Sequence, residues 1–434
     1  MTRNDAGRLF TNIVKRRPAS FLVGIAVLGL GLRLLFSLGY WTGQPLTRDE
    51  REYFSLARSV AAGHGFVYDA DVLSGPVDPF GRAPGYPLFL SLVGGGHGVS
   101  QSVPSAVKVA QSIVGTAGVV LVGIVAWRLA GPIAAVAAAL VAACYPPLVC
   151  IAAYGLSEAI VWPLGLAAAW LFDRAVQPGC KYATVSGFLC GALTGATALV
   201  RPATIFFLLL AVPWLVWRRT LFMAAALALG GIVVLTPWTL RNYGHYGRFV
   251  LVASEGGVTF WTGNHPLAIG EGDLAANPDL KRESLALKAR HADLTEEQME
   301  PVYYRDALTW IGANPGRWLL LEVRKAFFLV VPIGPSYRLH SARYRAASVV
   351  SYVLLLPVAL VGLWRLGLRR RDAPGLWLLA GSAIAACLVF FPQERFRIPV
   401  IDPVLVVCAG ALFLTDDQTA AIRRHVTRAG GNAT

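Results

Sequence analysis

Charged residues are scarce in this chain. Only 15% of the 434 residues are Asp, Glu, Lys or Arg, and 55% are hydrophobic, whereas a soluble domain carries about 25% charged residues. The six cysteines show no paired spacing of the kind that zinc or redox motifs use. No A-x-A cleavage site follows the first apolar run. These absences argue against a soluble domain, a zinc or redox module and a cleaved leader at that run.

The apolar residues gather in ten long runs. Most runs reach the roughly 20 residues that a helix needs to cross the hydrocarbon, once flanking Gly, Ser and Thr are included. The sequence therefore predicts an all-α integral membrane protein, a polytopic bundle of about ten transmembrane helices. The runs are 21–38, 107–126, 133–149, 159–172, 183–200, 205–216, 224–235, 349–363, 376–391 and 400–414.

The net charge of +14 raises the possibility of nucleic-acid binding, but its distribution favours a membrane. The basic clusters lie beside alternate ends of the apolar runs, as the positive-inside rule requires, so we expect membrane lipids and no nucleic acid as partners. Both termini are predicted to be cytoplasmic. The clusters are Lys15, Arg16, Arg17, Arg128, Arg174, Lys181, Arg218, Arg219, Arg365, Arg369, Arg370, Arg371, Arg423 and Arg424.

The run 318–333 is ambiguous, and the charge rule decides it. If it crossed the membrane, residues 369–371 would lie outside, so we expect it to stay at the outer interface. The predicted regions are a cytoplasmic tail 1–18, a transmembrane module 19–240 with a first outer loop 41–104, a second outer loop 241–346, C-terminal transmembrane helices 347–415 and a cytoplasmic tail 416–434.

Several short elements are predicted in the two outer loops. Residues 50–62 have the apolar spacing of an amphipathic helix, which we expect to lie flat on the membrane interface. The apolar segment 86–93 is too short to span. Thr295-x-x-Gln298 has the form of a capping box, and a short helix is predicted over 303–311.

Polar residues collect near the outer helix ends that this topology defines. A charge at that depth is costly unless it is paired or serves a site. A carboxylate there is suited to taking a proton from a hydroxyl, and several arginines are suited to holding a phosphate. One carboxylate with an arginine cluster is enough to transfer a sugar from a polyprenyl-phosphate carrier, because the phosphate leaving group needs charge stabilisation more than protonation.

The ordered motifs resemble the GT-C glycosyltransferase superfamily, in its protein-mannosyltransferase and aminoarabinose-transferase branch. The motifs run in order along nearly the whole chain. They are Asp49-Glu50-x-x-Tyr53, Gly63-His64-Gly65-Phe66, Arg82-x-Pro84-Gly85-Tyr86-Pro87, Ser157-Glu158, Arg201-Pro202, Pro237-Trp238-x-x-Arg241-Asn242, Trp261-x-Gly263-Asn264 and Arg395-Phe396-Arg397-x-Pro399.

The resemblance implies inverting transfer of a hexose or pentose from a polyprenyl-phosphate donor to a lipid, glycan or protein acceptor. It implies a multi-pass protein of a bacterial-type inner membrane, with the site on the periplasmic face. Asp49 maps onto the family's catalytic aspartate, with Glu50 beside it, and Arg395 and Arg397 map onto its phosphate-holding motif. The further candidates for binding the substrate or the carrier phosphate are Arg82, Tyr86, Glu158, Arg201, Arg241 and Asn242.

Each candidate also has a structural interpretation. Asp49 and Glu50 would also fit as solvated charges that pair with Arg48 and Arg51 on a loop. Arg241 and Asn242 would also fit as a structural turn after a proline. The arginines also suit a membrane-interface anchor. No cofactor is expected, although Asp49, Glu50 and Glu158 would suit a divalent metal if they converge.

Two other functions fit parts of the sequence. A flippase or transporter of lipid-linked saccharides also needs many helices and outer arginines, but its polar sites normally lie near the bilayer midplane. The helix interiors here are almost free of ionisable groups. A polysaccharide polymerase or ligase would share much of the chemistry, but the Asp-Glu loop fits it less well.

Overall fold

The computed structural model describes residues 18–69, 72, 81–96, 98, 101–367 and 373–414. Within these residues every regular element is a helix and there is no strand, which confirms the predicted all-α class. The basic clusters at 15–17, 369–371 and 423–424 lie outside the described residues. The charge-rule argument about the run 318–333 rests on these clusters, so it stays a prediction, as do both cytoplasmic tails.

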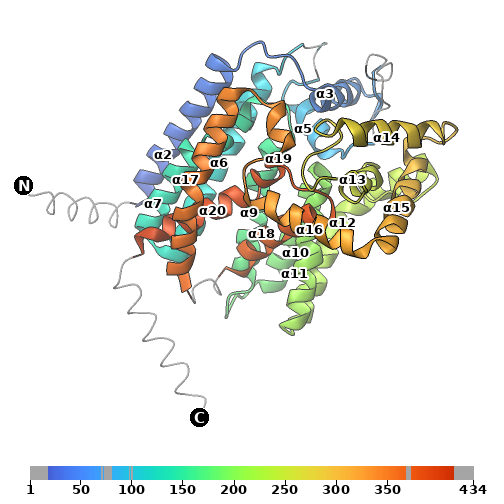
Figure 1. Ribbon diagram of the computed structural model, residues 1–434. Coiled ribbons are helices and arrows are strands. Elements are labelled where there is room, and N and C mark those ends of the chain that lie inside the picture. The colour runs from blue at the N-terminus through green and yellow to red at the C-terminus, as the bar shows by residue number, and fades with distance from the viewer. Residues whose placement is uncertain are drawn as a thin grey trace, which may run out of the picture.

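All ten apolar runs form helices that pack into one bundle (Figure 1). They are α2 (Pro18–Leu34, continued by the π-helix η1, Leu35–Tyr40), α6 (Ser105–Ala130), α7 (Pro132–Cys144), α9 (Glu158–Ala175), α10 (Ala183–Val200), α11 (Phe206–Trp217), α12 (Leu221–Tyr246), α17 (Ala342–Leu366), α18 (Pro374–Val389) and α20 (Ile401–Gly410, continued by η6, Ala411–Phe413).

Five of these helices are long and apolar enough to cross a membrane alone, namely α2 with η1, α6, α10, α12 and α17. A sixth span is counted if α7 is joined to α8 (Pro146–Cys150) and η2 (Ile151–Ala153), across a bend of 60°. Three of the other apolar helices are shorter, namely α11 together with η3 (Pro202–Ile205), α18, and α20 together with η6. The count of ten crossings stays a prediction.

Glycines allow a very close contact between helices α10 and α12. A Cβ at Gly191 of α10 would lie 1.9 Å from the carbonyl oxygen of Leu227 in α12, and one at Gly230 would lie 2.1 Å from that of Phe188. Small residues let membrane helices approach backbone to backbone. A side chain at either glycine would push the two backbones apart, so this spacing of α10 and α12 requires glycine at both positions.

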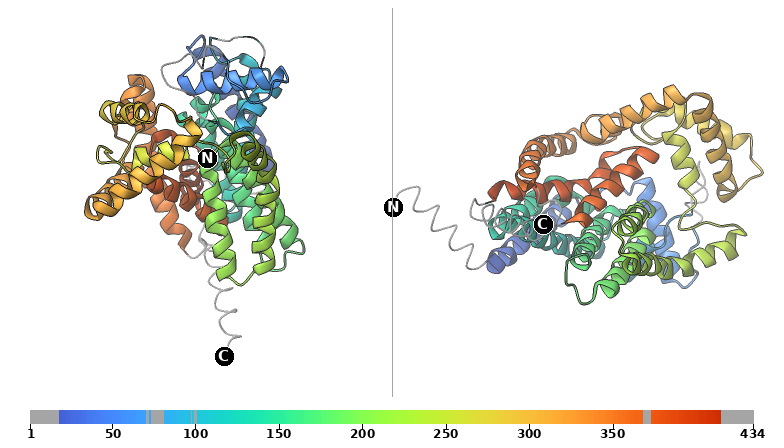
Figure 2. Two further views of the ribbon diagram at one scale, coloured as in Figure 1. Left: turned by 90° about the vertical axis from the view of Figure 1, so that its right-hand side faces the viewer. Right: turned by 90° about the horizontal axis from the view of Figure 1, so that it is seen from below.

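Helices α3 (Arg48–Ala61) and α5 (Gly85–Leu92) lie across one end of the bundle (Figures 1 and 2). They match the predicted amphipathic helix and the predicted short segment. Phe54 and Ala57 of α3 are fully buried and share a cluster with Leu90 of α5. The apolar face of α3 therefore packs inside the protein, and the position of this helix on the membrane interface stays a prediction.

The region between α12 and α17 builds a small helical unit of its own. Its elements are α13 (Gly256–Gly263), α14 (Pro278–Ala289), α15 (Glu296–Ala313), α16 (Pro315–Val330) and η4 (Pro335–Leu339). The capping box at Thr295 and Gln298 is present, and α15 contains the predicted helix 303–311. The unit has an apolar core around Trp261, Met299 and Tyr303. α12 itself runs to Tyr246, beyond the predicted boundary at residue 240.

Helix α16, the ambiguous run, is tied to the bundle by polar contacts. Lys325 is fully buried and donates to the side chain of Asn264 at 3.1 Å and to the carbonyl oxygen of Leu388 at 2.7 Å. Asn264 follows the last turn of α13 and also donates to the carbonyl oxygen of Val389. One amide side chain thus joins α13, α16 and α18.

We expect Gly263→Ala to destabilise the protein. A Cβ at Gly263 would lie 1.7 Å from the carbonyl oxygen of Phe390, so the backbones must separate, and overpacking of this kind typically costs about 1–3 kcal/mol. The measurement is the apparent melting temperature in detergent. Gly312→Ala is the matched control, because nothing lies within 4 Å of a Cβ there. Equal melting temperatures for the two variants would contradict the prediction.

Candidate active site

Asp49 is placed by the start of α3. The Thr47 hydroxyl accepts from the Glu50 N–H at 3.4 Å, and the Glu50 carboxylate accepts from the Thr47 N–H at 2.7 Å, which is a complete capping box. This cap fixes the first turn of the helix. Asp49 stands in that turn, where the helix N-terminus favours a negative charge.

Arg82, just before α5, binds three carboxylates at once. Its Nη2 donates to Asp49 Oδ1 at 2.9 Å, its Nε to Glu52 Oε2 at 2.6 Å and its Nη1 to Glu255 Oε2 at 2.9 Å. The guanidinium also lies 5.4 Å from the ring centroid of Tyr53. A guanidinium has five donors in a rigid fork, which suits it to join several acceptors. Arg82 therefore joins α3 to the segment that enters α13.

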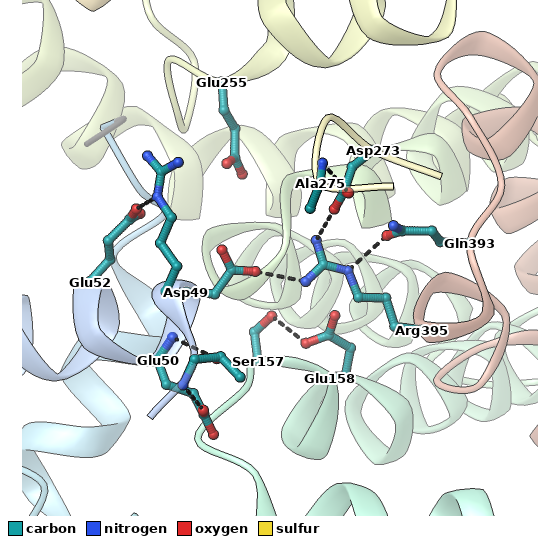
Figure 3. A network of polar contacts seen from close by, with 12 residues as sticks. Asp49, Glu50, Glu52, Ser157, Glu158, Glu255, Asp273, Ala275, Gln393 and Arg395 are labelled. Carbon is teal, nitrogen blue, oxygen red and sulfur yellow. Dashed lines mark hydrogen bonds and ion pairs between the residues drawn. The ribbon is translucent and has the colours of Figure 1, made fainter. Parts of the chain in front are cut away.

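Arg395, from the C-terminal part of the chain, binds the same aspartate. It lies on α19 (Glu394–Arg397), and its Nη1 donates to Asp49 Oδ2 at 2.7 Å (Figure 3). Its Nε donates to Gln393 Oε1 at 2.9 Å, and its Nη2 lies 3.7 Å from Asp273 Oδ2. The side chain is 37% exposed, so it stays open to a ligand while it holds Asp49.

The two arginines control the ionisation of Asp49. Burial alone would raise the pKa of Asp49, but Arg82 and Arg395 hold this pKa well below its ordinary value. Burial likewise opposes the charge of Arg395, yet Asp49 and Glu158 keep its pKa above the usual range. Asp49 and Arg395 are therefore both charged near neutral pH.

A second ion pair lies beside the first. Glu158 begins α9, and its Oε1 lies 2.6 Å from Arg201 Nη1; its Oε2 accepts from the Ser157 hydroxyl at 3.3 Å. Arg201 follows α10, which ends there because Pro202 opens η3 (Pro202–Ile205). The structure thus brings Asp49, Arg82, Glu158, Arg201 and Arg395 together, five of the ten predicted site residues.

Glu50 and Tyr86 are placed outside this network. Both carboxylate oxygens of Glu50 accept from backbone N–H groups, one from Thr47 and the other from Gly155 at 2.7 Å, and Glu50 is turned away from Arg395 (Figure 3). Tyr86 is fully buried and donates to Gln111 at 2.6 Å. Both residues support the elements that carry the site.

Arg241 and Asn242 lie in the last two turns of α12, and the structure places neither in the network. Asn242 is buried and donates to the carbonyl oxygen of Val250 at 3.0 Å. Arg241 donates to Asn242 Oδ1 at 3.2 Å and lies 4.8 Å from the ring centroid of Trp238. These contacts close the turn after α12, which agrees with the structural interpretation of the motif.

Arg397 is also separated from Arg395. Its Nε donates to Asp402 Oδ1 at 2.9 Å, and the two side chains are 4% and 0% exposed. Its guanidinium lies 3.6 Å from the ring centroid of Tyr352. In a single helical turn, residues three apart share a face, so Arg397 follows Glu394 into the interior while Arg395 faces the site.

Arg397→Met is expected to lower the free energy of unfolding by about 3–5 kcal/mol, because it leaves the buried Asp402 carboxylate without its cationic partner. Thermal unfolding in detergent measures it. Adding Asp402→Leu to the same chain should recover most of the loss, since it removes the unpaired charge. If Arg397→Met alone were as stable as wild type, the structural role of Arg397 would be contradicted.

The sequence motifs did not single out four further residues of the network: Glu52, Glu255, Asp273 and Gln393. Glu52 lies one turn after Asp49 on α3, so helical spacing was available to find it. Glu255 and Asp273 lie among the many acidic residues of the second outer loop, and nothing in the sequence distinguishes them. Within the described residues no group of three His, Cys, Asp or Glu side chains is arranged to hold a metal ion.

Solved structures similar to this chain include the oligosaccharyltransferase AglB from Archaeoglobus fulgidus in complex with an inhibitory peptide and a dolichol-phosphate. That match has a TM-score of 0.56 and 15% identity, and it covers 96% of this chain and 52% of AglB. The Archaeoglobus fulgidus oligosaccharyltransferase tethered with an acceptor peptide containing the NVT sequon via a disulfide bond gives a TM-score of 0.55 and 17% identity, and the match covers 92% of this chain and 49% of that chain. ArnT from Cupriavidus metallidurans, bound to undecaprenyl phosphate, gives 0.40 and 15%, covering 91% and 77%.

No protein-family model and no curated protein matches the sequence. The chain spans about half of the length of the AglB chains. The likeness nevertheless covers nearly the whole of this chain. The chain therefore has the fold of these oligosaccharyltransferase structures, which agrees with the fold that we expected from its ordered motifs.

Proposed function

We propose that this protein is a membrane glycosyltransferase that moves a hexose or pentose from a polyprenyl-phosphate donor to an acceptor outside the cytoplasm. The observation that carries the proposal is Asp49, a carboxylate 25% exposed, held between Arg82 and Arg395. The fold supports it, because AglB with the same fold is an oligosaccharyltransferase in complex with a dolichol-phosphate. The acceptor is a lipid, a glycan or a protein.

In the proposed reaction Asp49 accepts the proton of an acceptor hydroxyl. The hydroxyl oxygen attacks the anomeric carbon in line, and the bond from this carbon to the phosphate oxygen breaks with inversion. The electron pair stays on the leaving polyprenyl phosphate. Arg395, with Arg82 or Arg201, stabilises the charge on that phosphate, which is the main demand of the step. The residues need no cofactor for this, and a divalent metal is not required.

Donor binding prepares the base in this scheme. In the free protein both oxygens of Asp49 accept from guanidinium groups, which makes the carboxylate a weak base. A phosphate that takes over Arg395 removes one of these partners. The pKa of Asp49 then rises towards its ordinary value, so proton abstraction becomes easier once the donor is in place.

The proposal of a lipid-linked donor is supported by a groove of about 650 Å³. Its walls include the apolar side chains of Phe328, Ile333 and Val349, and two arginines, Arg338 and Arg345, also line it. Its Tyr337 accepts a 3.5 Å hydrogen bond from Arg397, two residues from Arg395. We propose that an isoprenoid chain lies in this groove while its phosphate reaches Arg395.

The proposal places the protein in a bacterial-type inner membrane as a multi-pass protein, with the site on the periplasmic face. The basis is the alternation of basic clusters along the sequence. Arg82, Arg201 and Arg395 gather at one site with Asp49 and Glu158, whereas alternating-access transporters place their polar sites near the midplane. This arrangement favours the enzyme over a flippase.

The test is sugar release from radiolabelled polyprenyl-phosphate hexoses and pentoses by the purified full-length chain in lipid vesicles, with envelope extracts as acceptor. Transfer, or slow hydrolysis to free sugar, is the expected result. Movement of labelled donor between leaflets, measured in the same vesicles, without any turnover would overturn the proposal in favour of a flippase.

A further inference from the structure

Phe396 is the shared neighbour of the two ion pairs in the site. Its ring centroid lies 4.7 Å from Cζ of Arg201 and 5.3 Å from Cζ of Arg395. Each arginine belongs to a different pair, Arg201 with Glu158 and Arg395 with Asp49. One aromatic ring therefore contacts the cations of both pairs.

The Phe396 ring is also held by contacts other than the two arginines. Phe391 is 5% exposed, and its ring centroid lies 5.7 Å from that of Phe396. The N–H of Phe396 donates to the carbonyl oxygen of Gln393 at 3.0 Å within the turn that forms α19. The position of the ring is thus set by the buried core and by the backbone rather than by the arginines.

The carboxylates of Glu158 and Asp49 compensate the charges of the two arginines, but each carboxylate holds only one of them, whereas the ring contacts both. A cation over the face of an aromatic ring within about 6 Å is attracted by roughly 0.5–2 kcal/mol. Both guanidiniums meet this distance on Phe396. Phe396 itself is half-buried, and the Arg395 side chain stays 37% exposed beside it, so a ligand can reach the guanidinium.

We infer that Phe396 is a positioning residue that fixes the spacing of Arg201 and Arg395, so that both guanidiniums bond to the same donor phosphate. The inference rests on the proposed function and adds to it. It makes Arg201 a direct phosphate ligand rather than only the partner of Glu158. Phe396 itself touches neither the phosphate nor the anomeric carbon and acts through the two arginines.

The experiment compares Phe396→Leu with Phe396→Tyr, which keeps the ring. Phe396→Leu is expected to raise the KM for the polyprenyl-phosphate sugar and the Kd for farnesyl phosphate about tenfold, with a smaller change in kcat; Phe396→Tyr should stay within about twofold of wild type. Farnesol, which has no phosphate, should be bound equally by all three. Phe249→Leu, at a ring 71% exposed in the segment after α12, controls for loss of an aromatic side chain.

A double variant separates positioning from general damage. In an Arg201→Gln background, Phe396→Leu should weaken farnesyl phosphate binding by much less than tenfold, because one of the two groups that it positions is gone. An undiminished effect there, or an unchanged Kd in the single variant, would overturn the inference. The proposed function fails separately, if wild type turns over no donor, and the farnesyl phosphate measurement still decides the role of Phe396.

Discussion

Asp49→Asn is expected to reduce sugar transfer by a factor of about 10²–10⁴, the usual contribution of a positioned general base. The amide has the size of the carboxylate, and one of its atoms can still accept from Arg82 or Arg395, the two present partners. It cannot take the proton of an acceptor hydroxyl near neutral pH. Single-turnover transfer from a radiolabelled donor measures the chemical step directly.

Two controls accompany this variant. Farnesyl phosphate should bind to it at least as well as to wild type, because Arg395 no longer has an anionic partner in Asp49. Asp279→Asn, at a side chain 67% exposed on α14, should leave transfer unchanged. If Asp49→Asn folds, binds the probe and transfers sugar at the wild-type rate, Asp49 is not the base.

Arg395→Ala is expected to lower kcat/KM by about 10²–10³, as the loss of one charge-stabilising donor does in other active sites. The same change should alter the pH dependence. Arg395 is one of two cations that depress the pKa of Asp49, so its removal raises this pKa. The acid limb of the rate profile, where Asp49 becomes protonated and inactive, should therefore move to higher pH.

Arg317→Ala, at an exposed arginine of α16, is the matched control and should change neither kcat/KM nor the pH profile. Arg395→Lys is informative as well, because a lysine keeps the charge but lacks the planar fork. We expect it to restore the position of the acid limb more fully than it restores kcat/KM. A rate profile that is unmoved in Arg395→Ala would show that Arg395 does not control Asp49.

The helices were predictable because their signal is local. Each apolar run is continuous in sequence, and the 3.6-residue spacing of α3 is visible without any tertiary information. The cap of α3 was equally visible: Thr47, followed three residues later by Glu50, has the form of a capping box. This pattern gives Glu50 a structural role, and it separates Glu50 from the neighbouring Asp49.

The site was predictable only where a motif marked it. Asp49, Arg82, Glu158, Arg201 and Arg395 stand in motifs, and the structure brings them together. The choice between Arg395 and Arg397 depends on a single turn of α19, whose direction is set by the packing of its neighbours. Glu255 and Asp273 were not predictable, because each lies outside the helices of the region between α12 and α17, where the sequence has no periodicity and the path of the chain depends on tertiary packing.

The ion pair between Asp49 and Arg395 also sets when the candidate site is complete during synthesis of the protein. Its two residues are 346 positions apart in the chain. At about 5–20 residues per second, a ribosome needs roughly 20–70 seconds to make the intervening segment. During that interval the first helices are already in the bilayer, and Asp49 has only the arginine of its own half, Arg82. A nascent chain that stalls before α19 therefore lacks Arg395, and its candidate site holds Asp49 with Arg82 alone.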